Sequence, residues 1–153
     1  MNTPLVYLIV INWNGLEHLA VCLDSVLAKT YANIRVVLVD NASNDESVAF
    51  AEAHCAGDPR FETMCLPRNM GWSGGNNAGM ARALEAGADY IVLLNNDTHT
   101  APDAVKKLVA MAESLPEAGA LAPKMLLFDY PAMLNSVGLE ASLAGAAWDR
   151  GVG

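Results

Sequence analysis

The stretch LLNNDT (residues 93–98) runs from two leucines directly into two asparagines, an aspartate and a threonine. With the residues before it, it forms DYIVLLN (89–95), and such a continuous apolar run is typical of a strand covered on both faces of a sheet. In open parallel sheets, ligands bind just beyond the carboxyl ends of the strands. The stretch therefore predicts a buried strand that ends at a binding site.

The rest of the chain alternates apolar runs with longer amphipathic segments. The apolar runs predict four more strands, at 5–11, 34–40, 61–66 and 119–128. The amphipathic segments predict helices at 15–30, 44–54, 73–87 and 100–115, for which Ser43, Asn44 and Thr100 are the expected caps. This order predicts an α/β fold with a mainly parallel sheet, right-handed crossovers and helices on both faces.

The composition limits the classes of function. The chain has 153 residues, of which 53% are hydrophobic, and a net charge of -8, which argues against nucleic-acid binding. No basic residue precedes the first apolar run, and no run reaches the length of a transmembrane segment. The three cysteines form no paired motif, which favours reduced thiols. We therefore expect a cytoplasmic protein, at most peripheral to the inner face of the membrane.

Polar side chains gather where the predicted strands end. The segments concerned are Asn12-Trp13-Asn14-Gly15, Asp40-Asn41, Arg68-Asn69 and Asn95-Asn96-Asp97-Thr98. The carboxyl ends of parallel strands meet at one edge of a sheet, so these four segments should converge there. Helix capping accounts for single residues of this kind but not for so many together.

The glycine-rich stretch GWSGGNNAG (71–79) matches neither the dinucleotide-binding fingerprint nor the phosphate-binding loop of nucleotide triphosphatases. Two interpretations stay open, namely a flexible turn before a helix and a backbone that lies close to a ligand. Trp13 and Trp72 are equally open, since each is suited either to stacking on a base or sugar or to packing.

Asp97 is the most specific candidate for a metal ligand. Mg²⁺ and Mn²⁺ prefer carboxylate oxygens and retain water and phosphate ligands, so one carboxylate suffices when a diphosphate supplies the others. His99 is better explained as a solvated surface residue.

Four motifs together resemble the family-2 glycosyltransferases of the GT-A fold. They are LIVINWNG (8–15), VVLVDNASNDES (36–47), RNMGWSGGNNAGMARA (68–83) and YIVLLNNDT (90–98), within a resemblance that extends from Val6 to about Gly138. The chain looks closest to the rhamnosyltransferase-like branch, which adds sugars to bacterial surface polysaccharides. The resemblance implies a Rossmann-like nucleotide-diphospho-sugar transferase fold. It also implies inverting transfer from a UDP- or dTDP-sugar to a saccharide or lipid-linked saccharide, aided by Mg²⁺ or Mn²⁺.

Carried over residue by residue, the resemblance implies nucleotide-binding roles for Asn12, Trp13, Asn14, Asp40, Asn69, Gly74, Gly75, Asn95 and Asn96. Asp40 stands where the family has an aspartate that accepts a hydrogen bond from uracil or thymine. Asn95 replaces the first aspartate of the family's Asp-x-Asp motif, while Asp97 keeps the metal-binding position. We therefore expect weak metal binding unless the nucleotide is present.

The resemblance also implies a division of the chain. Residues 1–128 correspond to the donor-binding domain, and 129–153 to the start of an incomplete acceptor-side region in a truncated fold. After Pro123 the only carboxylates are Asp129, Glu140 and Asp149, and none lies in the family's acidic motif. No catalytic base is therefore identified here, and the chain alone is expected to be inactive. Apolar residues left open after 124, Met125, Leu126, Leu127 and Leu134, favour a homodimer.

Two other classes of function stay open. The first is a non-catalytic module that binds or assembles around a nucleotide-sugar. The second is an enzyme that binds a nicotinamide or adenosylmethionine cofactor, although the missing glycine fingerprint after the first strand argues against it.

Overall fold

The structure, a computed structural model, describes residues 3–28, 30–141 and 147–149, and it divides the chain into two compact units. The first unit comprises residues 1–106 and the second 107–153. The predicted binding residues from Asn12 to Asp97 all belong to the first unit.

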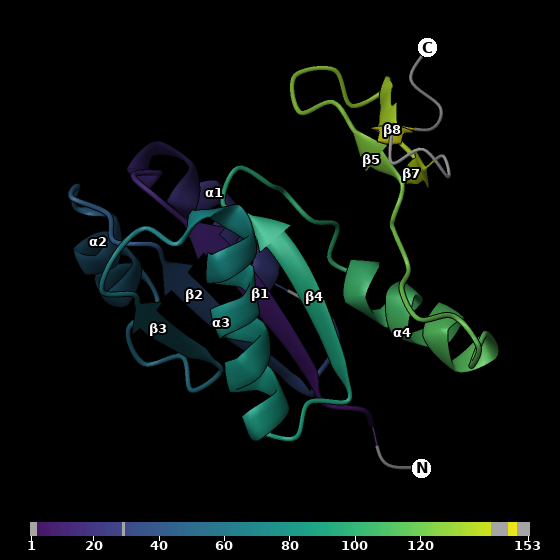
Figure 1. The fold of residues 1–153 in the computed structure, drawn as a ribbon, viewed down its shortest axis with the longest axis horizontal. Helices are drawn as coiled ribbons and strands as arrows, with labels where there is room; N and C mark the ends of the chain where they lie inside the picture. Colours follow the sequence, from purple (N-terminus) through teal and green to yellow (C-terminus); the bar gives the residue numbers. More distant parts are fainter. Residues whose placement is uncertain (1–2, 29, 142–146, 150–153) are drawn as a thin grey trace. The chain divides into compact units, whose positions relative to one another are not determined.

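The first unit contains a four-stranded parallel sheet (Figure 1). Its strands are β1 (Val6–Asn12), β2 (Ile34–Asp40), β3 (Phe61–Cys65) and β4 (Tyr90–Asn95), in the spatial order β3-β2-β1-β4. In the register, Asn12 lies opposite Asp40 and Ile11 lies opposite Asn95. The predicted parallel sheet is confirmed, and the polar ends of β1, β2 and β4 lie side by side at one edge.

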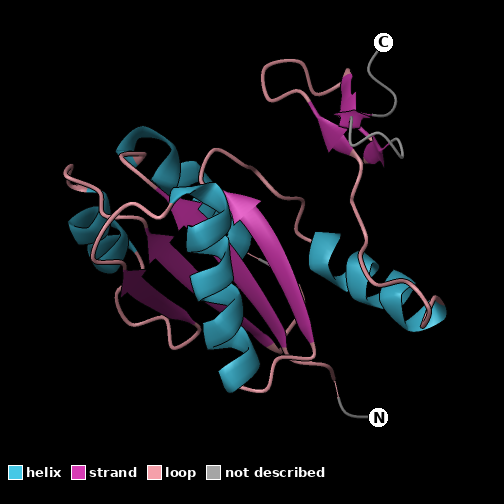
Figure 2. Cartoon of the chain, in the orientation of Figure 1, coloured by secondary structure: helices cyan, strands magenta, loops and turns pink. Residues whose placement is uncertain are grey.

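Helices cover both faces of this sheet (Figure 2). Helix α3 (Gly71–Glu85) packs on one face, where Ala83 joins a buried cluster with Ile9 and Val39. Helices α1 (Leu16–Leu27) and α2 (Ser47–His54) contact each other on the opposite face. Because alternate strand residues face opposite sides, the fully buried residues of β1 and β2 supply both layers of the core.

The glycine-rich stretch lies within helix α3, which begins two residues before the predicted start at residue 73, so the stretch is not a flexible turn before a helix. Helix α3 begins at Gly71, and Gly75 and Gly79 lie four residues apart on its buried face. A Cβ on Gly75 would overlap the side chain of Ile11, and one on Gly79 would overlap Ile9. These two glycines therefore allow α3 to approach β1 closely, which is a packing role that the sequence pattern alone did not indicate.

The predicted capping of α2 by Ser43 or Asn44 is wrong, because this helix begins only at Ser47. Asp45 accepts a hydrogen bond from the backbone N–H of Ser47 at 3.1 Å, while the Ser43 hydroxyl donates to Asp40. The side chains after β2 thus hydrogen-bond to neighbouring loop residues and do not cap the helix.

Helix α4 (Ala104–Ser114) begins four residues after Thr100, whose backbone N–H donates to the Ser25 hydroxyl.

The second unit contains most of helix α4, and after that helix its described residues form only short strands. β5 (Met125–Leu126) pairs antiparallel with β6 (Leu134–Ser136), and β7 (Leu139–Ala141) pairs antiparallel with β8 (Ala147–Asp149). The predicted ten-residue strand at 119–128 is therefore wrong, and Pro123, which has no N–H to donate to a strand ladder, falls within the irregular part. After Phe128 the described residues form only the three short strands β6, β7 and β8. In the described part of the chain, no helix has both the length and the apolar character needed to cross a membrane.

Candidate functional site

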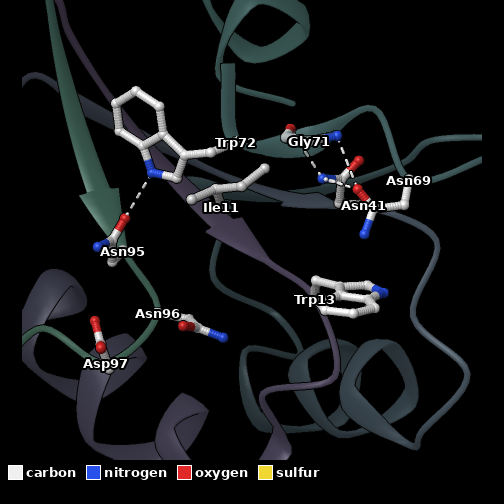
Figure 3. Close-up of a pocket in the computed structure, with 9 residues that line it drawn as sticks. All are labelled: Ile11, Trp13, Asn41, Asn69, Gly71, Trp72, Asn95, Asn96 and Asp97. Atoms are coloured by element: carbon white, nitrogen blue, oxygen red, sulfur yellow. Dashed lines mark hydrogen bonds between the residues drawn. The ribbon is translucent and has the colours of Figure 1, made fainter. Parts of the chain in front are cut away.

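A pocket of about 400 Å³ opens at the carboxyl-end edge of the sheet (Figure 3). It is lined by Ile11, Trp13, Asn41, Asn69, Gly71, Trp72, Asn95, Asn96 and Asp97. These residues come from the ends of β1, β2 and β4 and from the start of α3. Five predicted site residues thus line one cavity: Trp13, Asn69, Asn95, Asn96 and Asp97. The other five lie outside its lining: Asn12, Asn14, Asp40, Gly74 and Gly75.

At the ends of β1 and β2 lies a set of hydrogen bonds that we call the buried network, made by Asn12, Asp40 and Ser43. Asn12 and Asp40 are only 1% and 3% exposed, and the Asn12 amide donates to Asp40 Oδ1 at 2.9 Å. The Ser43 hydroxyl donates to the same oxygen at 2.6 Å, and the Ser43 backbone N–H donates to Oδ2 at 2.9 Å. Both oxygens of the Asp40 carboxylate therefore already accept hydrogen bonds from the protein.

Asn12 also connects the network to the loop after β4. Its Oδ1 accepts a hydrogen bond from the Asn96 amide at 2.7 Å. Gly15 lies against this contact, because a Cβ at that position would overlap the Asn96 amide. One buried asparagine thus holds together the ends of β1, β2 and β4.

Asn14 joins two loops at the same edge. Its backbone N–H donates to the Ser43 hydroxyl at 2.9 Å, and its Oδ1 accepts from the backbone N–H of Asn44 at 2.8 Å. Asn14 adopts a positive φ of 50°, a conformation that asparagine tolerates better than most residues. The residue fixes the backbone after β1 rather than lining the cavity.

Asn41 is a lining residue for which the sequence predicted no role beyond its place at a strand end. It is buried, its amide donates to Asn69 Oδ1 and to the Gly71 carbonyl, both at 3.1 Å, and its Oδ1 accepts from Met70 N at 2.8 Å. Asn41 therefore holds the segment 69–71 in place as one wall of the pocket. Its position directly after Asp40 was the available signal, but the partners lie about thirty residues away.

Two indole rings lie at the pocket. Trp13 is 57% exposed and Trp72 is 60% exposed, so neither is a core packing residue. The Trp72 indole N–H donates to Asn95 Oδ1 at 3.0 Å, which ties the start of α3 to the end of β4 (Figure 3). The cavity thus has exposed aromatic surface as well as carboxamide groups.

Asp97 is exposed on the loop after β4, and no described residue forms a hydrogen bond or ion pair with its carboxylate. Within residues 3–28, 30–141 and 147–149 there is also no group of three or more metal-ligating side chains. A hard cation such as Mg²⁺ fits a single free carboxylate in a polar pocket only if a ligand supplies further oxygens.

Two cysteine thiols, Cys65 at the end of β3 and Cys55 directly after α2, are not activated. Burial, followed by the negative charges of Asp40 and Glu52, raises the pKa of Cys65 above its ordinary value. Burial and the charges of Asp58 and Asp24 raise the pKa of Cys55 to about 11. Both thiols stay protonated near neutral pH, which excludes them as thiolate nucleophiles.

Comparison with known proteins gives a consistent family. The sequence model of glycosyl transferase family 2 matches residues 7–126. The chain is 30% identical over 111 residues to the succinoglycan biosynthesis protein ExoO of Rhizobium meliloti (strain 1021), covering 72% of this chain and 30% of that protein. The chain spans between 20% and 42% of the length of the first curated relatives that it matches.

Solved structures share the fold at low sequence identity. S. aureus TarS in complex with UDP has a TM-score of 0.65 at 16% identity, over 82% of this chain and 43% of that one. The mannosyltransferase PcManGT from Pyrobaculum calidifontis, in complex with GDP-Man and Mn²⁺, has a TM-score of 0.63 at 20% identity, over 73% and 33%. The sheet and its helices therefore have the GT-A nucleotide-sugar transferase fold, while the rhamnosyltransferase-like branch stays a prediction.

Proposed function

The chain belongs to glycosyl transferase family 2, and from this premise we propose that it is the donor-binding part of an inverting glycosyltransferase. The donor is a UDP- or dTDP-sugar, and the acceptor is a saccharide or lipid-linked saccharide. The observation that supports this proposal best is the pocket at the carboxyl-end edge, where exposed indoles, carboxamides and one free carboxylate meet.

The lining suits the parts of such a donor. Trp13 offers an exposed aromatic face on which a base or sugar ring can stack. Asn69, whose Oδ1 already accepts from Asn41 and Gly71, offers the N–H groups of its carboxamide to the base and ribose. Helix α3 begins beside them at Gly71, so its first backbone N–H groups favour negatively charged ligand groups nearby. Gly74 and Gly75, in the first turns of α3, would act by keeping side chains out of this wall.

We propose that Asp40 accepts a hydrogen bond from the base of the donor. Its hydrogen bonds within the protein allow this contact but leave little room for it. An ionised carboxylate has about four lone-pair sites, and Asp40 uses three of them within the buried network. One acceptor site on Oδ2 is left for the N3–H of uracil or thymine. Because the residue is 3% exposed, the base would have to insert closely against the end of β2. Asn12 and Asn14 would then serve the nucleotide by holding that end in place.

The loop after β4 would hold the cation, Mg²⁺ or Mn²⁺, through Asp97. When bound, the metal would act as a Lewis acid that offsets the charge developing on the departing diphosphate. Asp97 supplies one carboxylate and no described residue competes for it, so its charge is fully available. Because the site has only this carboxylate, cation and diphosphate should bind cooperatively. The Mn²⁺ and GDP-Man in the PcManGT structure support a metal-linked donor.

Transfer of the sugar also needs an acceptor and a catalytic base. We assign residues 1–128 to donor binding and 129–153 to the start of the acceptor-side region, with the base outside this chain. Without a base to deprotonate the acceptor hydroxyl, the 153-residue chain should bind donor without transferring sugar. The similarity to the succinoglycan biosynthesis protein of Rhizobium meliloti supports a role in bacterial polysaccharide synthesis. We propose that the product is a surface polysaccharide and that the enzyme acts at the inner face of the membrane.

Isothermal titration of the 153-residue chain with UDP and dTDP, with and without Mn²⁺, tests this function. We expect binding of at least one of the two, and about tenfold higher affinity with Mn²⁺ because a shared cation links Asp97 to the diphosphate. ADP and GDP serve as controls for the base. If neither UDP nor dTDP binds in the presence of Mn²⁺, the proposed function is wrong.

A further inference from the structure

The hydrogen bond between Trp72 and Asn95 fixes which end of the Asn95 carboxamide is free. An indole N–H can only donate, so the atom that faces Trp72 Nε1 at 3.0 Å must be the Asn95 oxygen. The amide nitrogen, with its two N–H groups, is then turned away from Trp72 (Figure 3). No described residue accepts a hydrogen bond from this nitrogen, and Asn95 is an exposed residue of the pocket lining.

From this geometry we infer that Asn95 is a hydrogen-bond donor to the diphosphate of the ligand, held in that orientation by Trp72. The inference rests on the proposed function and adds a recognition mode to it. Asn95 then contacts the ligand directly, while Trp72 is a positioning residue. Two residues at the end of β4 then hold the diphosphate. The Asn95 amide would contact it directly, and Asp97 would contact it through a cation.

The chemistry of position 95 explains why a carboxamide is useful there. A carboxylate at this position would also accept from the Trp72 indole, but it would present only a negative charge to a diphosphate. A carboxamide with its oxygen already occupied presents N–H groups, and N–H groups donate well to anionic oxygens. The diphosphate is the ligand group that gains most, because its oxygens are charged whereas ribose and sugar hydroxyls are not.

The same geometry predicts a smaller dependence on metal than two carboxylates would give. Two carboxylates repel a diphosphate until a cation neutralises them, whereas one carboxylate and one amide donor repel it less. The wild-type chain should therefore retain measurable affinity for UDP or dTDP when all divalent cations are removed.

The test compares Asn95→Asp with the wild type in EDTA, using NMR titration of UDP, dTDP and uridine. The substitution removes the amide donor but keeps an oxygen for Trp72, so the fold is preserved, and circular dichroism verifies this. We expect affinity for the nucleoside diphosphate to fall by about tenfold or more without metal, and affinity for uridine to stay unchanged. The gain in affinity on adding Mn²⁺ should become larger than in the wild type.

Two further variants sharpen the test. Asn77→Asp adds the same charge on the exposed face of α3, outside the pocket lining, and should change metal-free affinity less than about twofold. Trp72→Phe keeps an aromatic ring but removes the indole N–H, which frees the carboxamide to rotate, and should lower metal-free affinity by about threefold.

Three results would overturn the inference. Unchanged metal-free affinity in Asn95→Asp would show that the amide does not contact the ligand. An equal loss for uridine would place the contact on the nucleoside instead of the diphosphate. A similar loss of metal-free affinity in Asn77→Asp would show that the effect is only electrostatic repulsion between the added carboxylate and the diphosphate. By contrast, a wild-type chain that binds neither UDP nor dTDP even with Mn²⁺ would refute the proposed function itself, and the inference with it.

Discussion

Asparagine and aspartate occur both at the ends of β1 and β2 and at the end of β4, but their side chains are buried in the first region and exposed in the second. At the ends of β1 and β2, Asn12 and Asp40 are buried and their polar atoms are joined in the buried network. Asn95, the last residue of β4, and Asp97, in the loop after it, are exposed, and the Asp97 carboxylate has no partner among the described residues. Hydrogen-bonded and buried polar groups hold loops in place, whereas exposed groups with free donors or acceptors can bind a ligand.

The largest expected difference between the two sides is in stability. Asp40→Ala leaves the Asn12 amide and two donors of Ser43 without their acceptor in a buried place, so we expect the free energy of unfolding to fall by about 3 kcal/mol. Urea denaturation monitored by circular dichroism measures it, and Asp97→Ala is the matched control. Equal midpoints for the two variants would remove the distinction between the buried and the exposed side.

The same variant also tests the proposed contact with the base. If Asp40 accepts from uracil or thymine, the stabilisation that UDP or dTDP gives the wild type should shrink in Asp40→Ala by more than the loss measured without nucleotide. An identical loss of stability with and without nucleotide would confine Asp40 to the buried network.

An intermediate effect is expected on the exposed side, and it concerns binding alone. Asp97→Ala should change the free energy of unfolding by less than about 0.5 kcal/mol, because the side chain is exposed and unpartnered. It should also abolish the gain in UDP or dTDP affinity on adding Mn²⁺, since no second carboxylate lies in the pocket lining. Calorimetry with and without Mn²⁺ measures this, and a gain that persists would locate the cation elsewhere.

The smallest expected effect is on stability and concerns Asp45, in the loop between β2 and α2. Burial raises the pKa of this carboxyl, but hydrogen bonds from the side chain and backbone of Ser47 and from the Leu16 backbone outweigh it, and the net pKa lies below 3.8. A carboxyl with a lowered folded-state pKa contributes stability above its unfolded pKa, and that contribution is lost as the pH falls through the folded value. Asp45 therefore stabilises the start of α2 at neutral pH.

Thermal melting between pH 7 and pH 2 measures this contribution. The melting temperature of Asp45→Asn should lie slightly below that of the wild type at neutral pH and approach it below pH 3.8, where the wild-type carboxyl becomes protonated. A constant gap between the two proteins across the whole range would mean that the charge of Asp45 contributes nothing.

Much of the first unit follows directly from the sequence. The apolar runs predicted the four parallel strands to within about two residues at either end. Burial on both faces explains the continuous apolar side chains of β1 and β2, whereas β3 and β4 have half-buried and exposed positions. The polar strand ends at Asn12, Asp40 and Asn95 indicated the edge at which the pocket lies, since parallel strands all end on the same side. The family motifs converge on this edge for the same reason.

Tertiary structure alone decided what each polar residue at that edge does. Asn12 meets Asp40 at a separation of 28 residues and Asn96 at a separation of 84, and no local pattern indicates such partners. The sequence predicted a helix that includes Gly75 and Gly79, but not their contacts with Ile11 and Ile9, which allow α3 to pack closely on β1. Sequence periodicity records whether a position is buried, whereas the satisfaction of a polar group depends on neighbours that only folding brings within hydrogen-bonding distance. For that reason the orientation of Asn95, which Trp72 sets from 23 residues away, is a property of the folded chain.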